Sequence, residues 1–156
     1  MTKPIPDGFT TLTPSLTFKD SKKAIEFYQK AFDAQVLDNM PNPKGSGTMH
    51  ATLKIGNSIL MMGDEMGPTC KSAETLGGSP ITLYVYVPNV DEAFKKAVDA
   101  GATSTMPVAD MFWGDRTGAV QDPFGYNWSI ATHQKDLSES EIQEGAKQFM
   151  AKMSEK

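Results

Sequence analysis

The chain has 156 residues, of which 39% are hydrophobic and 22% charged, so it can form a folded core and disorder is excluded. Its net charge of -4 is spread out without a basic run, which argues against binding to nucleic acid or to an anionic membrane surface. One cysteine, no apolar leader and no stretch of roughly twenty apolar residues lead us to expect a cytoplasmic protein outside the membrane.

The first half of the chain predicts a strand, a helix and three further strands. Residues 11–19 are typical of a strand, and Asp20 is placed to cap a helix over residues 22–32. Gly56 and Asn57 predict a hairpin turn, because both residue types tolerate a positive φ. The remaining strands of this half are predicted at residues 35–40, 49–55 and 58–62.

The second half repeats this order after a linker, residues 63–80, that is rich in Gly, Pro, Ser and Thr. Residues 81–87 predict a strand that is rich in β-prone side chains. Asn89 is placed to cap a helix over residues 90–100, and Gly101 to end it. The remaining strands are predicted at residues 102–106, 117–121 and 126–132.

Each half is therefore a βαβββ module, and the two modules cover about residues 10–66 and 78–133 of one domain, 1–133. One helix covers only one face of a four-stranded sheet, so two such sheets are expected to enclose a trough. The sequence predicts an α+β fold of two paired, curved mixed sheets, with the trough as a site for a small molecule.

Residues 134–156 predict a helical extension after this domain. Ser138 and Glu141 have the spacing of a capping box at the start of a helix. An apolar stripe runs from Ile142 to Met153 along that helix and must be covered. Two partners are open: a second subunit at a dimer edge, or the helices of the same chain.

The run from Phe112 to Arg116 is the main candidate binding element, because it has no counterpart in the first half. Phe112 and Trp113 supply an aromatic wall, and Asp115 follows them directly. Arg116 is the only arginine of the chain, and its planar cation suits either an anionic ligand or a structural ion pair. Tyr84 and Tyr86 share one face of the strand at 81–87, and they either line the trough or pack against it.

Two residues of the first half are candidate acid–base groups. If Ala51 faces the helix, His50 faces the trough, where a neutral imidazole can act as a general base. Glu65 lies just beyond a strand, where it either turns back into the trough mouth or stays in water. We interpret His133 as a surface group at the end of the domain, and Asp122 as a turn residue.

Several short motifs occur in a defined order and spacing between residues 10 and 133. They include AIEFY at 24–28, LMM at 60–62, GGSP at 77–80, FWGDR at 112–116 and DPFG at 122–125. Together they resemble the vicinal oxygen chelate superfamily, which includes glyoxalase I, bleomycin-resistance and extradiol dioxygenase proteins, and more narrowly its PhnB-like branch. The resemblance implies the paired βαβββ fold and a homodimer, whereas it implies function only weakly.

The resemblance also implies where a metal would bind. Metal-dependent members carry a His, Gln or Glu on the first and last strand of each module. The corresponding positions in this chain are Thr13, Leu60 (or Met62), Thr82 and Ser129. Neutral hydroxyls bind divalent ions poorly and Leu cannot bind them, so we predict no cofactor and none of the usual metal. A divalent metal held by other ligands, such as His50 and Glu65, stays open.

Two main functions remain open from the sequence. The first is a metal-independent protein of the glyoxalase/bleomycin-resistance type that holds an aromatic or anionic ligand between Trp113, Tyr84 and Arg116, with His50 as a polar anchor. The second is an enzyme, such as a lyase or isomerase, for a small carbonyl or anionic substrate. In it His50 is the base and Arg116 holds the anion. A structural role through the C-terminal helix is a third.

Overall fold

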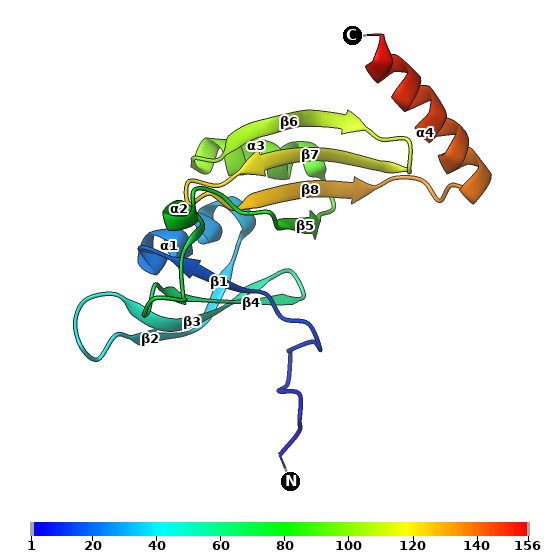
Figure 1. The fold of residues 1–156 in the computed structure, drawn as a ribbon. Helices are drawn as coiled ribbons and strands as arrows, with labels where there is room; N and C mark the ends of the chain where they lie inside the picture. The colour runs from blue at the N-terminus through cyan, green and yellow to red at the C-terminus, as the bar shows by residue number, and fades with distance from the viewer. Residues whose placement is uncertain (1, 156) are drawn as a thin grey trace.

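The computed structural model describes residues 2–155 and contains two four-stranded sheets, each with one long helix (Figure 1). The first module contains β1 (Ser15–Phe18), α1 (Ser21–Phe32), β2 (Gln35–Pro41), β3 (Thr48–Ile55) and β4 (Ser58–Asp64). The second contains β5 (Thr82–Tyr86), α3 (Val90–Ala100), β6 (Thr103–Asp110), β7 (Asp115–Gln121) and β8 (Asn127–His133). The short α2 (Ala73–Leu76) lies in the linker, and α4 (Glu139–Ser154) follows the second module.

The two sheets have equivalent topologies. Their strand orders are β1-β4-β3-β2 and β5-β8-β7-β6, and in each sheet the first strand is parallel to its neighbour while the other pairs are antiparallel. The predicted α+β fold of two βαβββ modules is therefore confirmed. Because each first strand has only one neighbour, β1 and β5 both leave one edge without a strand.

The ends of the main helices follow from the predicted capping residues. Asp20 accepts a hydrogen bond at 3.2 Å from the backbone N–H of Lys23, and Asn89 does the same at 3.3 Å for Glu92. Gly101 ends α3 with a φ of +126°, a conformation that L side chains rarely adopt. The expected capping box of Ser138 is also present at the start of α4.

Two elements differ from the sequence prediction. The linker contains α2, which its turn-rich composition did not indicate. β6 continues to Asp110 through Pro107, where a loop was expected. Proline removes a backbone donor, and the strand tolerates this because β6 is an edge strand of its sheet.

Alternation along the strands gives each sheet one face covered by a helix and one helix-free face. Leu16, Ala51 and Leu53 of the first sheet belong to the core under α1. In the second sheet the core contains Trp128 and Ile130. The residues that alternate with these lie on the helix-free faces. They include His50, Thr52 and Met61 in the first sheet, and Tyr84, Tyr86, Asp115, Thr117, Ser129 and His133 in the second.

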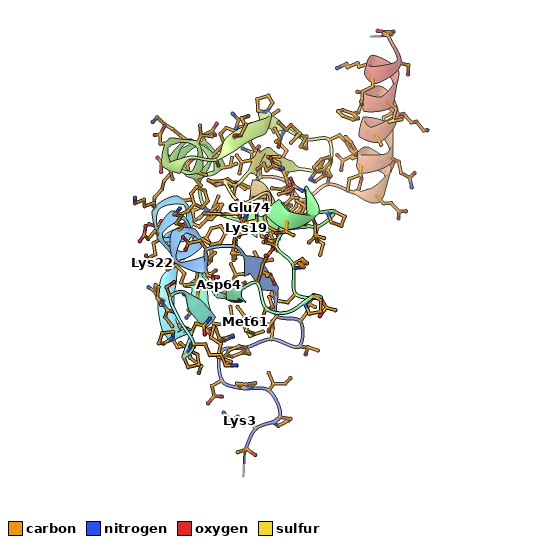
Figure 2. All side chains as sticks on the ribbon, turned by 60° about the vertical axis from the view of Figure 1, so that its left-hand side comes forward. Lys3, Lys19, Lys22, Met61, Asp64 and Glu74 are labelled. Carbon is orange, nitrogen blue, oxygen red and sulfur yellow. The ribbon has the colours of Figure 1, made fainter. Side chains whose placement is uncertain are left out.

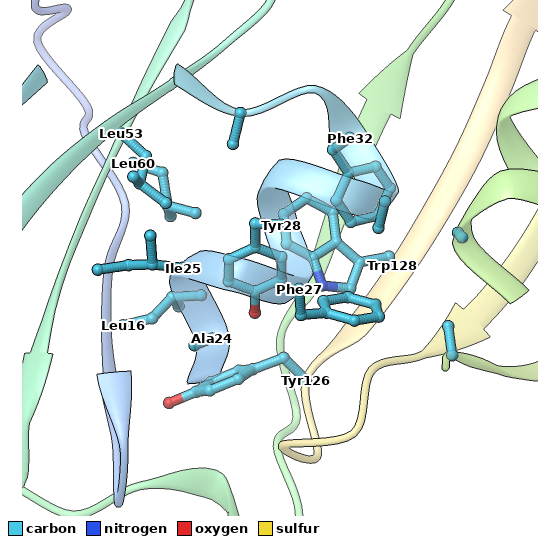
Figure 3. Close-up of a cluster of buried hydrophobic side chains, with 14 of the residues drawn as sticks. Leu16, Ala24, Ile25, Phe27, Tyr28, Phe32, Leu53, Leu60, Tyr126 and Trp128 are labelled. Carbon is cyan, nitrogen blue, oxygen red and sulfur yellow. The ribbon is translucent and has the colours of Figure 1, made fainter. Parts of the chain in front are cut away.

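The modules are joined through their helix-covered sides. Phe32 at the end of α1 stacks on Trp128 of β8, with ring centroids 4.4 Å apart (Figure 3). The Asp122 carboxylate, buried beside them, accepts hydrogen bonds from the Tyr28 hydroxyl at 2.5 Å and from Trp128 Nε1 at 3.0 Å. At the edge of β1, the Tyr126 hydroxyl donates to the carbonyl of Thr17 at 2.6 Å. Side chains that are distant in sequence thus fix one module against the other.

α4 projects from the two sheets, as Figures 1 and 2 show. Its contact with the domain runs through Phe112, whose ring lies 5.5 Å from that of Phe149. Exposed apolar side chains remain along the helix, among them Phe149, Met150 and Met153. The C-terminal part of the apolar stripe is therefore left open to solvent in the single chain, whereas Ile142 is partly covered. No helix within residues 2–155 is long and apolar enough to cross a membrane.

Candidate functional site

A groove of about 730 Å³ lies between the two modules, and we call it the inter-module groove. It is bounded by the segment before β1, the end of α1, the β3–β4 hairpin and β5. Its apolar wall includes Phe32, Ile55, Leu60, Leu83, Val85 and Trp128. The groove exists because β5 has no strand beyond it, so that Leu83 and Val85 border open space.

Polar side chains of the groove come mainly from the β3–β4 hairpin. Lys54, Asn57 and Ser58 line it there, and all three are exposed. Asp33 also lines it, but this carboxylate forms an ion pair with Lys96. The groove therefore combines an aromatic and aliphatic interior with one lysine that has no ion pair among the described residues.

A second group of side chains occupies the helix-free face of the second sheet, and we call Tyr84, Tyr86, Asp115, Thr117 and His133 the Asp115 cluster. Asp115 Oδ1 lies 2.7 Å from His133 Nδ1, and Oδ2 accepts a hydrogen bond at 2.9 Å from the Tyr86 hydroxyl. The Tyr84 hydroxyl donates to the same oxygen at 3.4 Å and lies 3.2 Å from Thr117 Oγ1. A single buried carboxylate thus orients two tyrosines and a histidine.

Hydrogen bonding sets the charge state of this cluster. Burial raises the pKa of Asp115, but hydrogen bonds from His133, Tyr86 and Trp113 outweigh it, so the pKa is lowered overall. Hydrogen bonds to Asp136 and to Asp115 raise the pKa of His133. The hydrogen bond to Asp115 also raises the pKa of Tyr86. The favoured state is a carboxylate beside a histidine that holds its proton to a higher pH than usual.

The two predicted acid–base residues, His50 and Glu65, belong neither to the inter-module groove nor to the Asp115 cluster. His50 faces away from α1, as the sequence predicted, but its Nε2 lies 3.2 Å from Thr52 Oγ1 and it does not line the inter-module groove. Glu65 accepts hydrogen bonds from the Ser72 N–H at 2.8 Å and the Ser72 hydroxyl at 2.7 Å. Hydrogen bonds from Thr75 and Ser72 lower its pKa to about 2. The Glu65 carboxylate therefore binds the linker at Ser72, and it does not line the inter-module groove.

The sequence left two roles open for Arg116, an anion clamp and a structural ion pair, and the structure has the ion pair. Its side chain lies on the side of α3, where Nε and one terminal nitrogen donate to Asp91, each at 2.9 Å. The other terminal nitrogen donates to Asp110 at 3.0 Å. Hydrogen bonds to Asp91 and Asp110 raise the pKa of Arg116, and that to Arg116 lowers the pKa of Asp91. Because each of its three guanidinium nitrogens already donates to a carboxylate, Arg116 is a poor anion clamp.

The other candidate residues of the Phe112–Arg116 run do not form one site, because their side chains pack against different elements. Phe112 packs against α4, since a Cβ on Gly145 would come within 2.8 Å of it. Asp115 points to the helix-free face, where it accepts a hydrogen bond from Tyr84, and a hydrogen bond from Trp113 contributes to its lowered pKa. Tyr84 also lines the inter-module groove, so it is the predicted site residue common to both places.

The sequence did not reveal that His133 belongs to this site, although the period of two along a strand places it on one face with Ser129. The same period correctly places Tyr86 on one face with Tyr84, whereas the hydrogen bond of Tyr86 to Asp115 had no local signal. The contribution of Phe32 and Trp128 to the groove had no such signal, since it depends on how the modules pack.

A family model for the Glyoxalase/Bleomycin resistance protein/Dioxygenase superfamily matches residues 10–130 of this chain. The chain belongs to this superfamily. An uncharacterised Mycobacterium tuberculosis protein, Rv0887c, is 40% identical over 136 residues, which are 85% of this chain and 79% of the relative. The corresponding protein of Mycobacterium bovis, Mb0911c, is 40% identical over 136 residues, covering 85% of this chain and 89% of its own.

Solved structures of the superfamily have the same architecture. TioX from Micromonospora sp. ML1 is 27% identical, with a TM-score of 0.64 over 80% of this chain and 98% of TioX. A gene product of Arabidopsis thaliana is 28% identical, with a TM-score of 0.64 over 79% and 98% of the two chains. A PhnB protein from Bacillus cereus shares the fold at 19% identity, with a TM-score of 0.64 over 79% and 99%.

The superfamily's metal positions do not fit a divalent ion in this chain. Thr82 and Ser129 lie on the helix-free face of the second sheet and offer only hydroxyls. The expected ligand position at Leu60, or at its alternative Met62, is not on the helix-free face, because both side chains belong to the core under α1. Thr13 precedes β1, and its hydroxyl donates to the carbonyl of Thr10. Among the side chains of residues 2–155, no three of His, Cys, Asp and Glu are grouped as metal ligands.

Proposed function

We propose that this superfamily member binds a small, mainly apolar molecule in the inter-module groove, without the usual divalent metal. The volume of the groove carries this proposal. At about 730 Å³ it lies within the range of roughly 300–1,000 Å³ that is typical of small-molecule sites. The site is thereby moved from the Phe112–Arg116 run, where the sequence suggested it, to the junction of the modules.

The chemistry of the walls supports an aromatic or aliphatic ligand. The stacked rings of Phe32 and Trp128 are mostly buried and contribute a small aromatic part of the wall, to which Leu83 and Val85 add an aliphatic part. Lys54, on the hairpin, is available for a polar or anionic end of such a ligand. A ligand of this kind gains mainly from the burial of apolar surface, at about 25 cal/mol per Å².

Fluorescence of Trp128 gives a direct test. In a Trp113→Phe protein, Trp128 is the single tryptophan, and it lines the groove. We expect the Trp128 emission to change, and then to saturate, as the aromatic anion 8-anilinonaphthalene-1-sulfonate is added. Leu83→Phe, which narrows the groove, should weaken binding about tenfold, a loss of about 1.4 kcal/mol. Ile81→Phe, an exposed position outside the lining, is the control. Equal affinity in the two variants would reject the groove as the site.

The enzymatic alternative lacks a comparable arrangement. His50 and Arg116 belong to different sheets, and the guanidinium nitrogens of Arg116 already donate to Asp91 and Asp110. A base and an anion clamp must face the same substrate, whereas neither of these residues lines the inter-module groove. The binding function is therefore the better-supported of the two.

We also propose that the protein is a homodimer, with a cytoplasmic location kept as a prediction from the sequence. The exposed apolar side chains of α4, including Phe149, Met150 and Met153, support a second subunit as their cover. Sedimentation velocity over a range of concentrations tests this. Met150→Asp should shift the protein toward monomer, whereas Lys152→Ala on the same helix should not. A monomer at every concentration would refute the dimer.

A further inference from the structure

The Asp115 cluster has features of a second binding site, which shares Tyr84 and Tyr86 with the rim of the inter-module groove. The Asp115 carboxylate is only 4% exposed, yet the aromatic residues around it are 45% (Tyr84), 61% (Tyr86) and 37% (Trp113) exposed. The two tyrosine rings are tilted against each other, with centroids 5.2 Å apart. Their hydroxyls are held by one carboxylate, so aromatic surface is presented to solvent in a fixed position on a sheet face that no helix covers.

The net charge of the Asp115 cluster and its neighbour Asp136 is negative or neutral. Within residues 2–155, neither a lysine nor an arginine forms an ion pair with Asp115, and its partner is His133. His133 is itself shared with a second carboxylate, since its Nε2 lies 3.0 Å from Asp136. Arg116, the neighbour of Asp115 in the chain, is directed to the opposite face of the sheet. Two carboxylates thus face one titratable cation, which disfavours an anionic ligand.

We propose that the Asp115 cluster binds a small organic cation, an amine or quaternary ammonium group with a compact apolar substituent. Cations are attracted to the faces of tyrosine and tryptophan rings within about 6 Å of the centroid, and a nearby carboxylate adds to this attraction. In the free protein, at a pH below the pKa of His133, the protonated ring supplies the balancing charge. A bound cation replaces that charge, and His133 then releases its proton to water.

The choice of ligand follows from the groups on this face. An anion would meet Asp115 and Asp136 without a fixed cation to offset them. A neutral aromatic molecule would gain from the rings of Tyr84 and Tyr86 but nothing from the carboxylate. An organic cation uses both, so its affinity should exceed that of a neutral or anionic molecule of similar size and shape.

The test uses benzyltrimethylammonium as the probe, with benzyl alcohol and phenylacetate as neutral and anionic comparisons. Titration is followed by calorimetry and by the NMR signal of the His133 ring, one of only two histidines in the chain. We expect the cation to bind more tightly than either comparison and to shift the His133 signal. Since the pKa of His133 is raised by Asp136 and Asp115, with Tyr84 and Tyr86 as the other titratable groups, affinity should rise as the pH rises through that pKa.

Variants separate this role from a purely structural one. Asp115→Asn should weaken binding of the cation at least about tenfold, whereas Asp110→Asn, an exposed carboxylate facing Arg116, should leave it unchanged. Tyr86→Leu removes a mostly exposed ring and should also weaken binding, while Tyr86→Phe should retain most of it. If Asp115→Asn does not fold, the two Tyr86 variants decide. Cation affinity that is the same in Tyr86→Leu as in the unaltered protein, or tighter binding of phenylacetate, would overturn the proposal.

Discussion

Replacement of Asp122 by alanine should loosen the junction between the two modules. The buried carboxylate accepts four hydrogen bonds. Two come from the side chains of Tyr28 and Trp128, at 2.5 and 3.0 Å, and two from the backbone N–H groups of Phe124 and Tyr126, at 2.9 and 3.0 Å. Each buried donor that loses its acceptor costs about 1–3 kcal/mol. Tyr28 and Trp128 are both buried, so neither can turn to water instead.

Counting the two side-chain donors in full and the turn amides in part, we expect Asp122→Ala to lower the free energy of unfolding by about 4 kcal/mol. That is a large share of the roughly 5–15 kcal/mol of a typical domain. Urea denaturation followed by circular dichroism and tryptophan emission measures it. Tyr28→Phe, which removes one donor and leaves no donor unpaired, should lose about 1 kcal/mol.

The surface pair of Lys3 and Asp7 supplies the control for this measurement. Both side chains are exposed, so Asp7→Ala should change stability by less than about 0.5 kcal/mol. A loss below about 1 kcal/mol for Asp122→Ala would show that the carboxylate does not join the modules. The reasoning would then fail, and the aromatic contacts of Phe32 and Trp128 alone would have to account for the junction.

Three further expectations concern packing and pH. Gly118→Ala would bring a Cβ within 2.7 Å of the Phe94 ring, so it should lower stability by about 2 kcal/mol in thermal denaturation, while Gly45→Ala, with open space around it, should not. Hydrogen bonds to Asp136 and Asp115 raise the pKa of His133, so the stability it contributes is complete below about pH 6.5 and is lost as the pH rises through the raised pKa. His133→Asn should flatten that part of the stability profile, and an unchanged profile would contradict the assignment. Glu65 has a pKa lowered to about 2, so its hold on the linker is complete above about pH 4.5 and is lost as the pH falls through about 2. Hydrogen exchange at residues 72–76 should be faster in Glu65→Gln at neutral pH, and equal rates in the two proteins would contradict this.

Most of the fold was accessible from the sequence because its signals are local. Helix caps such as Asp20 and Asn89, the turn glycine Gly56 and the alternation along β3 each depend on a few neighbouring residues. The repeated order of elements then determined the pairing of strands within each module. α2 was missed because it has only four residues and no apolar pattern of its own, although Ser72 and Gly77 cap it locally.

The candidate site was less accessible, because it depends on the packing of one module against the other. Arg116 was singled out as the one arginine, but its partner Asp91 lies 25 residues away on α3, and no local pattern reveals which face the side chain takes. Asp115 and Tyr84 were selected individually, without their mutual hydrogen bond and without His133, the other partner of Asp115. The position of the groove follows from the contact of Phe32 with Trp128, which are almost one hundred residues apart.

β5 links the two proposed sites mechanically. Its residues alternate: Leu83 and Val85 belong to the apolar wall of the groove, while Tyr84 and Tyr86, which also line the groove, donate hydrogen bonds to Asp115 on the helix-free face. A ligand that displaces this strand from one side changes the setting of the rings on the other. If one ligand alters the affinity for the second, thermodynamic reciprocity requires the second to alter the affinity for the first by the same factor. One short edge strand would thereby couple the two sites, so that the affinity for each ligand would depend on whether the other is bound.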